Sequence, residues 1–120
     1  MRVFLVCALV LCSQCKMPQA PSVPEMEVTP TLTRTMYDKG CAMCHGPDGK
    51  GETSMGKALD PRPRNLANPE WQRATTDDRI KQVILKGGEV NGLSAAMPAN
   101  DLTSAQVAGL VKLIRSFEVK

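Results

Sequence analysis

The side chains best suited to chemistry lie in one pentapeptide, Cys41-Ala42-Met43-Cys44-His45. Two thiols separated by two residues and followed at once by an imidazole can form covalent bonds or coordinate a metal. His45 is the only histidine of the chain, and no cysteine follows Cys44. Any site built on these three side chains must therefore take its remaining ligands from other residue types.

Three kinds of site use a Cys-x-x-Cys pair. A thioredoxin-like redox pair needs a βαβ setting, and this chain shows no strand pattern. A tetrahedral zinc site needs further cysteine or histidine ligands, which are missing here unless a carboxylate or a second chain contributes. The third kind, covalent attachment of a c-type haem, requires the histidine directly after the second cysteine, as His45 is. Cys41 and Cys44 would each add to one vinyl group, and His45 would coordinate the iron.

For a second axial ligand the sulfur of a methionine is the natural choice, because the chain has a single histidine. Of seven methionines, three lie in the N-terminal 30 residues, Met43 is held between the two cysteines, and Met36 falls on an expected helix. Met55 lies in an expected loop and is the competitor of Met97. Small residues precede Met97, and Pro98 restricts the loop that carries it. Met97 is the predicted ligand; a packing methionine and a five-coordinate iron is the alternative.

From about Thr31 to Val119 the chain resembles class I c-type cytochromes, the mitochondrial-like monohaem family widespread in bacterial periplasms. The resemblance rests on three pieces in order: Cys41-Ala42-Met43-Cys44-His45-Gly46, then Met97-Pro98, then a C-terminal helix from Val107 to Phe117. It implies an all-α cytochrome c fold, with three to five helices around one covalently bound haem c. It also implies electron transfer with His/Met ligation and no enzymatic reaction, between redox proteins such as a membrane reductase or oxidase.

The resemblance further indicates which residues would support the haem. In the family the proximal imidazole donates its Nδ1 hydrogen to a backbone carbonyl, often that of a proline. Pro63 is the expected acceptor here. Trp71, Arg62 and Arg64 are candidates for binding the haem propionates. The alternative is that Trp71 is an ordinary core aromatic and that the two arginines are ordinary surface charges.

One position departs from the family pattern. The family usually has a glycine eight positions before the first haem cysteine, and this glycine touches an aromatic residue of the last helix. Thr33 and Leu113 occupy these places in this chain. A larger residue facing a smaller one could keep the contact volume roughly constant, so we expect Thr33 to face Leu113.

The elements that must position these residues are all expected to be helical. Their signals are capping residues, a proline at a helix start, terminal glycines and apolar stripes of helical period. We expect helices at about Thr31–Cys44, from Asn68-Pro69, from Thr75 or Thr76 to Gly87-Gly88, and from the Thr103/Gln106 capping box onward. The stretch 46–66 reads as a loop. A loop of this length needs something to pack against, and a haem edge would serve.

Size and composition agree with a cofactor-dependent domain. The 120 residues suffice for one domain, and only Tyr37, Trp71 and Phe117 supply aromatic side chains after the first 30 residues. Small domains with so few large core residues usually need a staple such as a metal or cofactor. The net charge of +3 comes from interspersed acids and bases, which argues against a nucleic-acid partner.

The N-terminus predicts export. Arg2 and ten apolar or cysteine residues match a secretory signal and are too short to span a bilayer. We expect residues 1–15 to be a signal peptide, 16–30 a proline-rich linker and 31–120 the cytochrome domain. Cys15 sits in a loose lipoprotein motif and is a candidate for lipidation; cleavage elsewhere or an uncleaved anchor are the alternatives. The protein would then be a monomer in the periplasm or on the outer face of a membrane.

Two other functions stay open. The domain could be a haem subunit of a larger respiratory complex, which the linker also permits. It could instead be a haem enzyme or gas sensor with an open iron position, although the absence of a second histidine counts against peroxidase-like chemistry.

Overall fold

The computed structural model describes residues 27–119, which contain helices and no strand. The helices are α1 (Pro30–Gly40), α2 (Ala42–His45), α3 (Ser54–Ala58), α4 (Pro69–Ala74), α5 (Asp77–Lys86), the 3-10 helix η1 (Glu89–Asn91) and α6 (Ser104–Arg115). The all-α prediction is confirmed. The expected signal peptide, Cys15 and most of the linker lie outside the described residues, and no helix within 27–119 is long and apolar enough to cross a membrane.

The first helix begins and ends differently from the prediction. Thr29 caps α1 by accepting a hydrogen bond from the Leu32 amide at 3.1 Å, with Pro30 in the first turn. The expected helix of 31–44 is divided, because α1 ends at Gly40 and α2 begins at Ala42, with Cys41 between them. Glycine is a poor interior helix residue, which favours a break at this point.

The later helices follow their sequence signals. Asn68 caps α4 and Thr76 caps α5, each through its side chain. Thr103 and Gln106 form both bonds of a capping box at the start of α6. The loop of 46–66 contains a helix that was not expected, α3, whose cap Thr53 also donates a 2.7 Å bond to the Met43 carbonyl. The short helices α2 and α3 raise the number of helices above the expected three to five.

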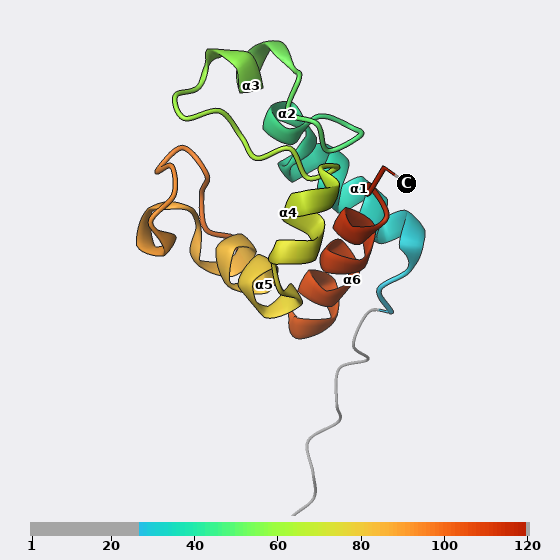
Figure 1. Cartoon of the computed structure of the whole chain (residues 1–120). Coiled ribbons are helices and arrows are strands. Elements are labelled where there is room, and N and C mark those ends of the chain that lie inside the picture. The colour runs from blue at the N-terminus through green and yellow to red at the C-terminus, as the bar shows by residue number, and fades with distance from the viewer. Residues whose placement is uncertain (1–26, 120) are drawn as a thin grey trace, which may run out of the picture.

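α1 and α6 lie side by side and enclose most of the core (Figure 1). Tyr37 of α1 is completely buried, and its ring lies 5.1 Å from the ring of Phe117. The expected apolar stripe of α6 faces the core, together with residues of α5. The buried members are Ile80, Ile84, Val107, Leu110, Val111 and Ile114.

Gly109 is the residue of α6 that meets Thr33. A Cβ atom at Gly109 would lie 2.7 Å from the Thr33 Oγ1, which is too close for any residue larger than glycine without rearrangement. Leu113, expected at this place, lies one helical turn further on and packs half-buried against the core. Relative to the family pattern, the sizes of the two contacting residues are exchanged between the helices: the larger residue, Thr33, is on α1, and the glycine, Gly109, is on α6.

A buried polar cluster joins α4 to α6. The Gln72 side chain donates to the carbonyls of Leu66, at 2.6 Å, and Ile114, at 2.9 Å. Arg115 donates to the Gln72 side chain and to the Thr75 carbonyl, and pairs with Asp77 at 2.7 Å. These bonds hold the C-terminal ends of α4 and α6 and the start of α5 together.

Candidate functional site

A cavity of about 340 Å³ opens between the α2–α4 segment, α5 and the loop that follows α5. Most of its wall is apolar, with Ile80, Val83, Ile84 and Leu110 among the lining residues. The predicted site residues all line it: Cys41, Cys44, His45, Pro63, Trp71 and Met97, together with Arg62 and Arg64. Met55, the competing methionine, is not among the lining residues and is 47% exposed.

The two thiols are placed by the single turn of α2. The amides of Cys44 and His45 both bond to the Cys41 carbonyl, at 3.2 and 2.9 Å, so the three side chains leave one turn of backbone. Burial, and secondarily the neighbouring Cys44, raise the pKa of the Cys41 thiol. A buried thiol of this kind stays protonated at neutral pH and is a weak nucleophile.

His45 is held as a neutral imidazole. Its Nδ1 lies 3.2 Å from the carbonyl oxygen of Arg64, to which a neutral ring can donate a hydrogen, leaving Nε2 with a free lone pair. Burial lowers the pKa of His45, partly opposed by this hydrogen bond. A neutral ring with one nitrogen anchored to a carbonyl is the form in which histidine binds a metal.

The acceptor carbonyl belongs to Arg64, so the expectation that Pro63 would supply it is wrong. The Pro63 carbonyl lies against Gly51, 3.2 Å from where a Cβ atom of that residue would be. In non-helical backbone successive residues face opposite sides, so only one of the two carbonyls can face His45. Pro63 still contributes to the cavity wall.

Backbone hydrogen bonds hold His45 and its acceptor in place. The Tyr37 hydroxyl donates to the Gly46 carbonyl at 2.8 Å, and the Gly51 amide donates to the His45 carbonyl at 2.7 Å. The Leu66 amide bonds to the Gly49 carbonyl at 2.7 Å. The segment that carries the acceptor is thus fixed to the loop that follows the histidine.

Met97 lines the cavity from the segment between α5 and α6. This half-buried residue has its carbonyl bonded to the Gly88 amide at 2.9 Å. Arg79 of α5 also lines the cavity and was not among the predicted site residues. Ile80 belongs to the apolar stripe of α5, and the position of Arg79 next to it was the sequence signal that could have placed Arg79 near the cavity.

Comparisons with known proteins show the family of this chain. The family model described as Cytochrome c matches residues 31–118. A solved structure, the c-type cytochrome KustC0563, is 32% identical, with a TM-score of 0.59, over 72% of this chain and 98% of that chain. No curated protein matched this sequence significantly.

A helical fold with a Cys-x-x-Cys-His turn on an apolar cavity defines a c-type cytochrome. The chain belongs to the cytochrome c family, as a class I member with one covalently bound haem c, and its chemistry is haem-based electron transfer. The residues present suit such a group: two thiols, a neutral imidazole and a thioether sulfur line the same largely apolar cavity.

Proposed function

We propose that this cytochrome carries single electrons through an iron ligated by His45 and Met97, and that it catalyses no substrate reaction. Cys41 and Cys44 form the thioether bonds. The observation that carries the proposal is that His45 and Met97 line one cavity. A thioether ligand raises the reduction potential and fills the position that a small ligand would otherwise occupy.

The polar groups at the cavity have supporting roles in this proposal. Trp71, Arg62 and Arg64 bind the haem propionates, since all three line the cavity and indole and guanidinium groups are hydrogen-bond donors. The Arg64 carbonyl keeps the Nδ1 hydrogen of His45 engaged, which fixes the ring orientation and increases the basicity of Nε2.

Spectroscopy of the purified holoprotein tests the ligation. We expect a methionine–iron charge-transfer band in the ferric form, no binding of carbon monoxide by the ferrous form, and loss of the band in Met97→Ala. Met55→Ala is the matched control and should keep it. Ready carbon monoxide binding by the wild type, with no spectral change in Met97→Ala, would instead support an open iron position and an enzyme or gas sensor.

We also propose that the domain acts outside the cytoplasmic membrane, tethered by a lipid on Cys15 through the linker of residues 16–30. As a monomer it would exchange electrons with redox proteins such as a membrane reductase or oxidase. Support comes from the sequence alone. Cys15→Ser should move the cytochrome from the membrane fraction to the soluble fraction, and an unchanged distribution would contradict the lipid anchor. Co-purification with a stable assembly would favour the subunit of a larger complex.

A further inference from the structure

The segment of residues 88–100, named here the Met97 loop, gains little from apolar packing outside the cavity. Val90 is 74% exposed, Ala95 and Ala99 are exposed as well, and none of the three lines the cavity. Since apolar side chains stabilise a segment in proportion to the area they bury, these residues hold the loop weakly, and hydrogen bonds to α5 contribute to its position.

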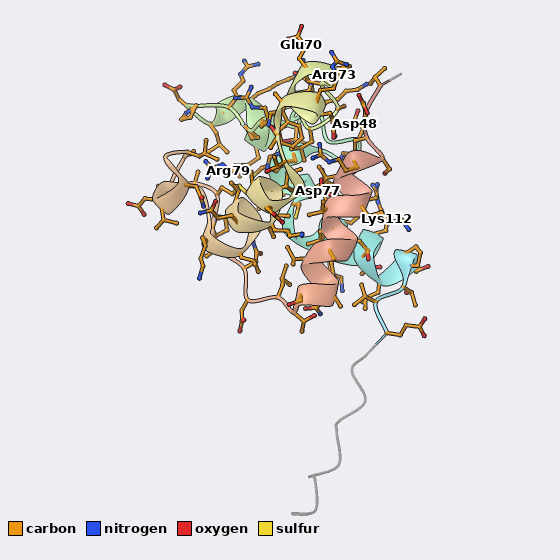
Figure 2. All side chains as sticks on the ribbon, turned by 60° about the horizontal axis from the view of Figure 1, so that its bottom comes forward. Asp48, Glu70, Arg73, Asp77, Arg79 and Lys112 are labelled. Carbon is orange, nitrogen blue, oxygen red and sulfur yellow. The ribbon has the colours of Figure 1, made fainter. Side chains whose placement is uncertain are left out.

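The strongest of these bonds join Arg79 to Asn91. Arg79 lies on α5 (Figure 2), and its guanidinium donates to the Asn91 side-chain oxygen and to the Asn91 carbonyl, both at 2.7 Å. The Asn91 side chain in turn donates to the Gly87 carbonyl at 2.7 Å. Within residues 27–119 no carboxylate forms a salt bridge with Arg79. Its guanidinium bonds the oxygens of Asn91 at shorter distances than the Gln82 side-chain oxygen, which lies at 3.4 Å. Bonds from a charged donor are stronger than neutral ones.

The C-terminal end of α5 and the residues that follow it hold the segment around Met97 directly. The Gly88 amide bonds to the Met97 carbonyl, and the Asn100 side chain bonds to the Ile84 carbonyl, both at 2.9 Å. The approach is close: a Cβ atom at Gly87 would lie 2.9 Å from the Met97 carbonyl oxygen. A Cβ atom at Gly88 would collide with the Ser94 carbonyl. A chain of contacts therefore runs from Arg79 through Asn91 and Gly87-Gly88 to Met97.

We propose that Arg79 and Asn91 are positioning residues for Met97, which clamp the Met97 loop onto α5 and so keep the methionine sulfur in place against competing ligands. The proposal rests on the proposed His/Met ligation. An external ligand can bind only when Met97 has left the iron, so its apparent affinity scales with the fraction of molecules in that state. Loss of the clamp raises this fraction.

Titration of the ferric holoprotein with imidazole tests the clamp. Asn91→Ala is the main variant, because Asn91 is not among the residues lining the cavity and can act only through the loop. We expect imidazole to bind about 10- to 100-fold more tightly than to the wild type, the range that corresponds to losing bonds to a charged group. Arg79→Gln should give a similar increase, and the double variant should not exceed the larger single effect by much.

Arg73→Gln is the matched control, because Arg73 is an exposed arginine of α4 with no described bond to the Met97 loop. Its imidazole affinity should equal that of the wild type. Should Asn91→Ala not fold, Arg79→Lys provides the test, since lysine keeps the charge and loses the two-pronged geometry. Imidazole affinities within about twofold of the wild type in these variants would overturn the clamp.

The two proposals fail in different ways. A wild-type protein without a methionine–iron band, or a Met97→Ala variant that binds imidazole no better than the wild type, would remove the ligation itself. A wild type with the band, together with Asn91→Ala and Arg79 variants of unchanged imidazole affinity, would leave the ligation intact and remove only the clamp.

Discussion

Tyr37 shows how much one side chain contributes to this site. It is the only tyrosine of the chain and is completely buried, and its hydroxyl supports the Gly46 carbonyl directly after the haem motif. Burial raises the pKa of Tyr37 above its ordinary value of 10.0. The folded protein therefore holds the phenolic proton more tightly than the unfolded chain does.

This difference predicts a stability loss at high pH. A raised pKa contributes stability that is complete below the unfolded pKa of about 10 and is lost as the pH rises toward the folded value. Tyr37→Phe should remove this part of the pH dependence, at a cost of about 1 kcal/mol at neutral pH for the lost hydrogen bond. Denaturant melts of both proteins between neutral pH and about pH 11 provide the measurement. Identical pH dependence in the two proteins would contradict the prediction.

His45 and Arg64 mark the limit of sequence reasoning at this scale. The pentapeptide specifies the covalent chemistry and the proximal ligand, because few other sites need those residues at that spacing. Whether the carbonyl of Arg64 or that of Pro63 accepts the hydrogen bond depends on which of the two carbonyl groups is oriented toward His45. That orientation is set by the bonds between residues 46–51 and 63–66, and no local sequence signal carries it.

At the scale of elements, the crossing of α1 and α6 depends on the fit between Thr33 and Gly109. Gly109→Ala introduces a methyl group 2.7 Å from the Thr33 Oγ1 and 3.2 Å from the Val28 side chain. We expect overpacking to lower the free energy of unfolding by about 1–3 kcal/mol. This loss outweighs the gain of about 0.8–1 kcal/mol in helix propensity, so Gly109→Ala should destabilise the protein. Thr33→Gly should also destabilise the protein, by leaving a void.

A double-mutant cycle measured by thermal unfolding tests this fit. Gly109→Ala combined with Thr33→Gly should be more stable than the sum of the two single effects predicts, because the new methyl group enters the space that Thr33 vacates. Leu113→Ala with Thr33→Gly is the matched comparison and should give a smaller coupling. Additive effects for Thr33 and Gly109 would disprove direct packing between them.

Gln72 is the second point at which elements are joined. Gln72→Leu keeps the volume roughly similar but leaves the Leu66 carbonyl without its partner. It also removes one donor to the Ile114 carbonyl, which keeps the Phe117 amide, and one acceptor of Arg115. An unsatisfied buried group costs about 1–3 kcal/mol, so we expect a destabilisation of this size in denaturant melts. Gln82→Leu, at an exposed position of α5, is the control. An equal effect at both positions would refute the role of Gln72.

The elements differ in how well the sequence predicted them. The caps Asn68, Thr76 and Thr103 act within one turn of their own helix, so local sequence suffices to find them. α3 and the contact of Gly109 with Thr33 were missed. Their stability comes from partners distant in sequence, since α3 rests on α2 and Gly109 on α1.

For the whole molecule, the haem is part of the core. Among residues 27–119, eight hydrophobic residues form the buried cluster, and the cavity separates α5 from the α2–α4 segment. A domain of this size with such a core has little stability to spare. Without haem, the two sides of the cavity would face each other across water or empty space.

The protein without haem should therefore be largely unfolded. We expect Cys41→Ser/Cys44→Ser, which removes both attachment points, to lose most of the helical circular dichroism signal of the wild type at 25 °C. Ala42→Ser/Met43→Ser changes the two residues between the cysteines and is the control that should retain it. Full helix content in the haem-free double variant would show that the polypeptide folds alone.

The burial of Cys41 has a consequence for the order of events in maturation. In the folded domain this thiol is half-buried with a raised pKa, so a folded polypeptide would be a poor substrate for thioether formation. The cavity is also closed from behind by Leu110 and Ile114 of α6, the last helix to be synthesised. The unfolded chain, in contrast, exposes its thiols at their ordinary pKa. We therefore expect haem attachment to precede folding, with a weak haem-free fold keeping both thiols of the precursor accessible.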